Sequence, residues 1–157
     1  MTSAQAVVQL DAQGQELARY STTRVSPEAQ PVDVAVQTQP DGSQIIWITT
    51  VGPALLIALD AQGDEVATWS LRPANSIDGP HLAVGPDGVY ATQPELGRIA
   101  RFDLAHVDTF TEFALPAPPE GIHKVVGLGV SPDGALLAAD SDHGLVLRLI
   151  PPQEPER

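Results

Sequence analysis

The chain has 157 residues, of which 43% are apolar and 18% charged, proportions that fit one folded domain and exclude a disordered chain. Acidic residues outnumber basic ones by 20 to 8, and the formal net charge of −12 disfavours nucleic acid and anionic membrane surfaces as partners. The sequence has no cysteine, which excludes disulfides, thiolate metal sites and cysteine nucleophiles.

We expect neither a signal peptide nor a membrane-spanning segment in this chain. No run of about 18 apolar residues occurs, so we predict no transmembrane helix and no direct membrane insertion. The N-terminal sequence MTSAQAVVQL lacks the basic end and long apolar stretch of a signal peptide. We expect a soluble chain of undetermined compartment, with an extracytoplasmic part of a larger protein as an alternative.

In chain order, the first predicted elements are two β-strands over 7–10 and 17–21, joined by the turn Asp11-Ala12-Gln13-Gly14. An identical turn, Asp60-Ala61-Gln62-Gly63, joins predicted strands over 54–59 and 65–71. The recurrence of this turn indicates that the start of the chain corresponds to the middle of a repeat.

Three Pro-Asp-Gly turns mark that repeat. Asp41, Asp87 and Asp133 lie 46 residues apart, and each turn separates two short β-type runs. Proline presets its φ, aspartate caps the turn, and glycine accepts φ > 0, so each unit predicts a hairpin. A second hairpin follows the first, as in 97–103 and 109–115. One repeat is therefore four antiparallel strands, a to d, and no segment has the apolar spacing of a helix.

A four-stranded sheet cannot bury both of its faces alone, and radial stacking of several sheets as the blades of a β-propeller covers them. The sequence predicts blades with two, four, four and three strands, 13 in all, whereas a closed ring usually needs at least about 16. A β-sandwich is the alternative, although it does not require so regular a turn spacing.

We therefore predict an all-β fold: a β-propeller segment of about three and a half four-stranded antiparallel blades in an incomplete ring. The predicted domain covers residues 1–150. Its blade pieces lie at about 6–21, 32–71, 81–115 and 125–150. The proline-rich tail 151–157 cannot continue a strand ladder.

The segment 82–115, LAVGPDGVYATQPELGRIARFDL…FTEFALP, resembles the NHL repeat and, more closely, the bacterial streptogramin-lyase-like propellers. The resemblance extends from Val7 to Ile150. In that lyase family, catalytic histidine and glutamate act with magnesium at one mouth of the ring, and strand b often ends in aromatic-Thr-Glu. The matching positions 48–50, 91–93 and 138–140 hold no glutamate, although Asp140 keeps a carboxylate. This departure predicts no lyase activity for the segment itself.

The most polar candidate site is Asp140-Ser141-Asp142-His143-Gly144, on the predicted b–c loop of the last repeat. Its carboxylates and imidazole could hold a hard cation or exchange protons, or the aspartates could simply cap a solvated turn. His81 and His123 lie on d–a loops, which share a mouth with the b–c loops in propellers. The candidate ligand-binding residues at this mouth are His81, His123, Asp140, Asp142 and His143.

We predict no catalytic residue and no metal ligand in this set, and no cofactor; a magnesium or calcium ion at the mouth is the alternative. His106 lies on a c–d turn at the opposite mouth and is expected at the surface. The large aromatic residues fall on strands and are expected to fill the space between blades. They are Trp47, Trp69, Tyr90, Phe102 and Phe113.

These observations favour a non-catalytic β-propeller module that is part of a larger ring or assembly and acts in protein–protein or ligand binding, or as a scaffold. The expected partners are a protein, further blades or a second copy of the chain. The alternative is a fragment of a propeller enzyme, a streptogramin-type lyase or a metal-dependent lactonase, with most catalytic residues elsewhere. A structural ectodomain of a membrane-anchored complex is a third hypothesis.

Overall fold

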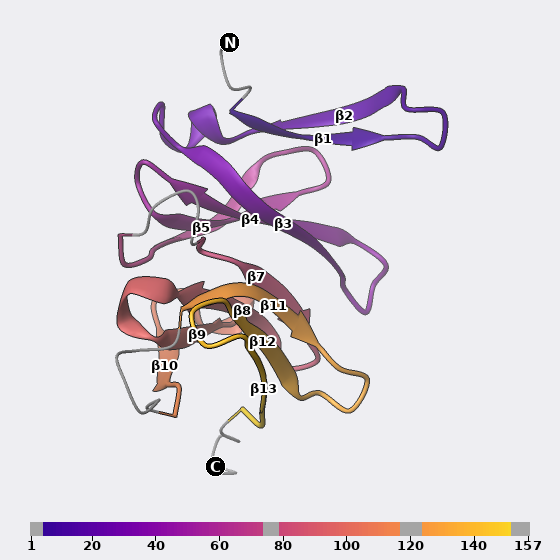
Figure 1. The fold of residues 1–157 in the computed structure, drawn as a ribbon. Coiled ribbons are helices and arrows are strands. Elements are labelled where there is room, and N and C mark those ends of the chain that lie inside the picture. The colour runs from indigo at the N-terminus through magenta and orange to yellow at the C-terminus, as the bar shows by residue number, and fades with distance from the viewer. Residues whose placement is uncertain (1–4, 74–78, 117–123, 152–157) are drawn as a thin grey trace.

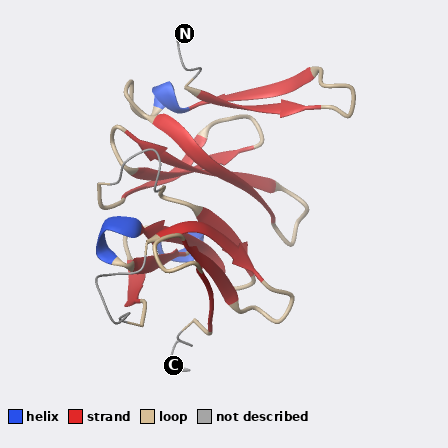
Figure 2. Ribbon diagram, viewed as in Figure 1, coloured by secondary structure: helices blue, strands red, loops and turns tan. Residues whose placement is uncertain are grey.

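A computed structural model of the protein describes residues 5–73, 79–116 and 124–151 (Figure 1). These residues form strands, turns and three-residue 3-10 helices, with no α-helix among them (Figure 2). The described part of the chain therefore contains no helix long and apolar enough to cross a membrane. The 3-10 helices are η1 (Thr22–Arg24), η2 (Pro94–Leu96) and η3 (Leu104–His106).

The described strands make four antiparallel sheets in chain order. The first blade contains β1 (Ala6–Leu10) and β2 (Glu16–Ser21). The second contains β3 (Gln30–Thr38), β4 (Gln44–Val51), β5 (Leu55–Asp60) and β6 (Glu65–Ser70). The third contains β7 (Leu82–Gly85), β8 (Gly88–Gln93), β9 (Arg98–Phe102) and β10 (Phe110–Ala114). The fourth contains β11 (Val125–Val130), β12 (Leu136–Asp140) and β13 (Leu145–Leu149).

Each strand pairs only with its neighbours in sequence, so each blade is a simple meander. The a strands β3, β7 and β11 lie side by side where the blades meet (Figure 1). The predicted all-β architecture, with two, four, four and three strands per blade, is confirmed. Because the a strands are adjacent, the loops at their ends meet at two common mouths.

The Pro-Asp-Gly turns have the backbone that their residues predict. Gly42, Gly88 and Gly134 have φ angles of +85°, +148° and +82°. Asp41 accepts hydrogen bonds from the amide and hydroxyl of Ser43, at 2.9 and 2.6 Å. The middle turn differs, because there Asp87 accepts from the Tyr90 hydroxyl at 2.7 Å.

The core lies between blades. Trp47 of the second blade stacks on Trp69, with centroids 5.8 Å apart, and Trp69 packs against Phe102 of the third blade at 5.4 Å. Tyr90 and the half-buried Phe113 belong to the next cluster, between the third and fourth blades. The predicted aromatic filling between blades is thereby confirmed, and it holds neighbouring sheets in fixed relation.

Candidate functional site

One mouth of the segment is formed by the d–a and b–c loops, and we call it the d–a mouth. The strand pairings place Asp33, His81 and Gly127 at equivalent positions, where strand a begins. Asp33 lies opposite Thr49, and Gly127 lies opposite Ala139. The carbonyl of His81 accepts from the amide of Thr92, and the amide of His81 donates to the Thr92 hydroxyl. These three positions follow one another from blade to blade at the same mouth.

Asp33 joins two blades. Its Oδ2 accepts a hydrogen bond from the amide of Leu82 in the third blade at 3.0 Å, and its Oδ1 accepts from its neighbour Val34 at 2.8 Å. The His81 Nδ1 lies 3.5 Å from Oδ2. Burial acts to raise the pKa of Asp33, but the hydrogen bonds from His81, Leu82 and Val34 outweigh it and hold that pKa below its ordinary value.

Sequence reasoning missed Asp33. The Pro-Asp-Gly turn follows His81 by six positions, but it follows Asp33 by eight because β3 runs longer before its turn. Asp33 and His81 therefore lie at different distances in sequence from their turns and do not align by position. Only the pairing of strands a and b shows that the two residues are equivalent.

His81 is held by its surroundings on both sides. Its Nδ1 faces Asp33, and its Nε2 is buried with no hydrogen-bond partner among the described residues. Gly79 packs on the ring so closely that an added Cβ would lie 2.8 Å from the imidazole Cδ2. The hydroxyl of Thr49 donates to the carbonyl of Pro80 at 2.6 Å and fixes the preceding loop. His81 is thus a positioned imidazole at the boundary of two blades.

Asp140 is buried and organises the last b–c loop. Its Oδ1 accepts from the amides of Asp142 and His143 at 3.1 and 3.3 Å, and its Oδ2 lies 2.8 Å from the His143 Nδ1. Asp142 itself is exposed. The capping geometry is the one expected of an aspartate in a turn, and the imidazole is bound to the same carboxylate.

The position at the end of strand b is buried in all three blades that have it. Thr50 donates to the Pro53 carbonyl at 2.8 Å and accepts from the amide of Leu55, where β5 begins, at 3.2 Å. In the fourth blade, Asp140 likewise accepts from backbone amides. Gln93 donates to Glu112 at 2.6 Å. Each side chain at this position therefore binds within its own blade.

The predicted site residues divide into separate groups. Asp140 and His143 form one pair, and His81 pairs with Asp33 instead. His123 lies outside the described residues. Among the residues that the structure describes, no group of three or more His, Asp or Glu side chains could hold a metal ion. His106 is exposed at the other mouth, with Nδ1 3.1 Å from Asp103 Oδ2.

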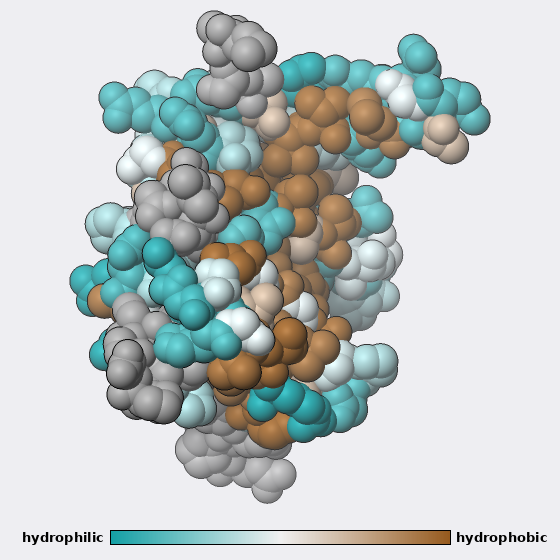
Figure 3. Space-filling view, in the orientation of Figure 1, coloured by the Kyte–Doolittle hydropathy of each residue, from teal (hydrophilic) through white to brown (hydrophobic). Residues whose placement is uncertain are grey.

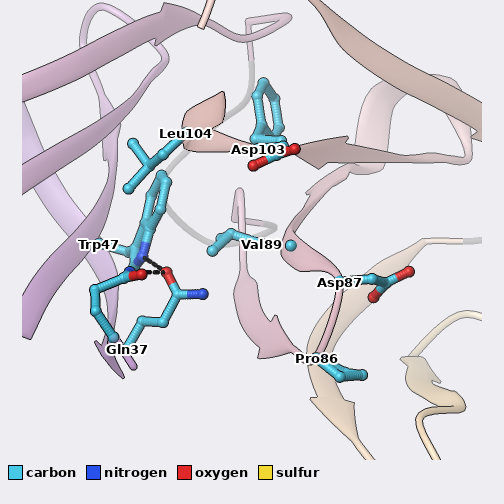
Figure 4. A pocket seen from close by; sticks show the side chains of 10 residues that line it. Gln37, Trp47, Pro86, Asp87, Val89, Asp103 and Leu104 are labelled. Carbon is cyan, nitrogen blue, oxygen red and sulfur yellow. Dashed lines mark hydrogen bonds between the residues drawn. The ribbon is translucent and has the colours of Figure 1, made fainter. Parts of the chain in front are cut away.

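A cavity of about 300 Å³ opens between the second and third blades at this opposite mouth (Figure 4). The Gln37 Oε1 accepts from the indole of Trp47 at 3.0 Å and from Gln39 at 3.1 Å. Asp87 and Asp103 line the far side in Figure 4. The cavity combines amide and carboxylate groups with a floor of core side chains, so it can exchange hydrogen bonds with a small polar molecule.

The four sheets of antiparallel strands, joined in meander order and stacked face to face, define a segment of a β-propeller. The chain is similar in fold to a catalytically inactive virginiamycin B lyase from Staphylococcus aureus crystallised with quinupristin, with TM-score 0.64 and 19% identity over 96% of this chain and 50% of that one. A streptogramin B lyase structure matches at TM-score 0.65 and 19% identity, over 94% of this chain and 49% of that one.

A protein of unknown function from Bacteroides caccae has the same fold, with TM-score 0.65 and 10% identity over 94% of this chain and 51% of that one. No protein-family model and no curated protein matches the sequence. The chain spans about half the length of the solved structures it matches. These likenesses confirm the expected lyase-like propeller fold.

Proposed function

We propose that the chain is a binding module: a β-propeller segment that forms part of a larger ring and contacts a protein or small ligand without catalysing a reaction. The observation that carries this proposal is the uncovered apolar surface of the fourth blade. Leu137 and Val146 are 38% and 71% exposed, whereas inward-facing Leu136 is fully buried. Exposed apolar patches of this kind mark interaction surfaces.

The d–a mouth supports the same proposal. The carboxylates of Asp33 and Asp140 are occupied by backbone amides and an imidazole, which is a positioning role. Exposed Asp142 and partly exposed His143 offer polar groups to a ligand. We propose that a ligand contacts this mouth through His81, Asp142 and His143, with Asp140 holding the loop. His123 completes the proposed set.

The experiment is light scattering after size-exclusion chromatography, combined with binding of a hydrophobic dye. We expect the purified chain either to self-associate or to bind the dye at its uncovered sheets. A compact monomer that excludes the dye and unfolds cooperatively would contradict the proposal, because no larger ring would then be needed.

The alternative function is a fragment of a lyase or a metal-dependent lactonase. One observation favours it: Asp140 and His143 form a 2.8 Å pair at the d–a mouth of a fold shared with streptogramin B lyase. The test is an assay with magnesium against quinupristin and a panel of lactones. Turnover that the His143→Gln variant abolishes would establish the enzyme, whereas no turnover in a folded chain supports the binding module.

A further inference from the structure

A groove of about 380 Å³ separates the first blade from the second. Figure 3 shows apolar side chains gathered between the β1–β2 hairpin and the sheet beneath it. The lining residues include Val7, Tyr20, Val34, Val36 and Ile46. The groove is thus an apolar recess beside the a strand of the second blade.

The equivalent surface of the third blade is covered. Val34 corresponds to Leu82 and Val36 to Val84, because each pair occupies the same register on strand a. Leu82 is only 4% exposed and packs in one cluster with Ala35 of the preceding blade. Val34 and Val36 are 43% and 54% exposed. The second blade therefore presents a face that a preceding a–b hairpin covers elsewhere in the fold.

The first blade lacks that hairpin in the described structure. Asp11 caps its turn through Gln13 and Gln15, just as Asp60 caps the turn between β5 and β6. Strands β1 and β2 are therefore c and d strands. The edge of β1 that faces the groove pairs with no described strand, so its backbone groups can accept strand b of another hairpin.

The fourth blade carries an a–b hairpin with an uncovered face. Leu137 of β12 corresponds to Trp47 and Tyr90, which are each 1% exposed under the next blade, whereas Leu137 is 38% exposed. Beside it, Gly129 corresponds to Ala35, and a Cβ built on Gly129 meets no atom within 4 Å. This small and apolar face matches the kind of surface that packs on strand a of the following blade.

We propose that the groove binds the β11–β12 hairpin of a second copy of this chain. The inference rests on the proposed function, and it names the partner that extends the ring. One copy of the chain spans about half the length of the similar solved propellers. Two copies related by a twofold axis therefore match the length of one of those propellers. The first blade of one copy and the fourth blade of the other would then form one shared blade. In it, β1 of one copy and β13 of the other are both c strands, so one of these two strands lies outside the four-stranded sheet.

The first measurement is the mass of the chain in solution. We expect twice the monomer mass of 16.5 kDa. Val36→Asp should raise the dimer dissociation constant at least about tenfold, because it places a charge in the apolar contact. Val66→Asp is the matched control: Val66 on β6 is 46% exposed, and this variant should dimerise as the parent does. A parent chain that remains monomeric at high micromolar concentration would overturn the inference.

The second measurement locates the contact. The chain has no cysteine, so single substitutions report unambiguously. Mixed Val36→Cys and Leu137→Cys chains should form a disulfide-linked dimer on mild oxidation, and Val66→Cys with Leu137→Cys should not. If the chain dimerises but the Val36→Cys and Leu137→Cys chains do not crosslink, the contact does not lie between the groove and the β11–β12 hairpin. If the chain is monomeric and its β1 amides exchange rapidly, the β1 edge is unpaired, and a second copy is not the partner that extends the ring. If the chain is monomeric and its β1 amides are protected, the edge is already paired, and the proposed function is contradicted as well.

Discussion

The carboxylate of Asp33, on the a strand of the second blade, accepts a hydrogen bond from the backbone amide of Leu82, on the a strand of the third, at 3.0 Å. At the same mouth, the Thr49 hydroxyl donates to the Pro80 carbonyl. Two side chains of one blade therefore bind the backbone at the start of the next. Apolar contact between blades has no direction, so these bonds supply the directional part of the interface.

Asp33→Asn should destabilise the chain near neutral pH. Asparagine keeps only one acceptor oxygen, so the amide of either Leu82 or Val34 loses its partner. One lost hydrogen bond to a charged group costs about 1.5–3 kcal/mol before solvent screening reduces it for this partly exposed side chain. The lowered pKa of Asp33 means that its ionised form stabilises the fold above the ordinary carboxyl pKa. That contribution is lost as the pH falls through the folded-state pKa.

Urea unfolding of the parent and Asp33→Asn chains at neutral and acidic pH checks both points. The difference in free energy of unfolding should shrink as the solution becomes more acidic. Asp142→Asn, at an exposed loop position, is the control and should change little. A constant difference between the two pH values would show that ionised Asp33 does not stabilise the interface.

Thr49→Val should cost about 1–3 kcal/mol in free energy of unfolding. Valine has nearly the shape of threonine but cannot donate, so the buried carbonyl of Pro80 loses its partner. Thr111→Val, at an exposed position of β10, is the matched control and should fall within about 0.5 kcal/mol of the parent. Equal values for the two variants in urea unfolding would contradict the proposed role.

Asp140→Ala should destabilise the b–c loop of the fourth blade, by about 1–3 kcal/mol, because two loop amides lose their acceptor. Hydrogen exchange followed by NMR should show faster exchange at Asp142 and His143 than in the parent. Asp142→Ala removes an exposed carboxylate from the same loop and should leave those rates nearly unchanged. Unaltered exchange in Asp140→Ala would mean that the loop holds itself without the cap.

Gly88→Ala should be more destabilising than Gly42→Ala, although both glycines have positive φ. A Cβ on Gly88 would lie 2.6 Å from the carbonyl oxygen of Phe102, whereas a Cβ on Gly42 meets no atom within 4 Å. Gly42→Ala carries only the backbone strain, about 1 kcal/mol. Gly88→Ala adds a clash with a strand of its own sheet. Thermal unfolding of both variants should rank them in this order.

The recurring turns, together with the β-type runs between them, predicted the strand order and the four sheets. Turn residues act through local geometry: Gly42 and Gly134 accept positive φ, and Asp11 and Asp60 bond to amides a few positions away. The matching turns at Asp11 and Asp60 also predicted that the chain begins within a blade. Such signals are visible in sequence because cause and effect lie within about five residues.

Only the tertiary structure decided the site and the interfaces. It paired His81 with Asp33, although these two residues lie at different distances from their turns, and it paired Asp140 with His143. It also showed that Val34 is exposed where Leu82 is buried. These relations depend on which blade lies against which, and contacts between residues some 50 positions apart are set by the packing of whole sheets, which no local pattern encodes.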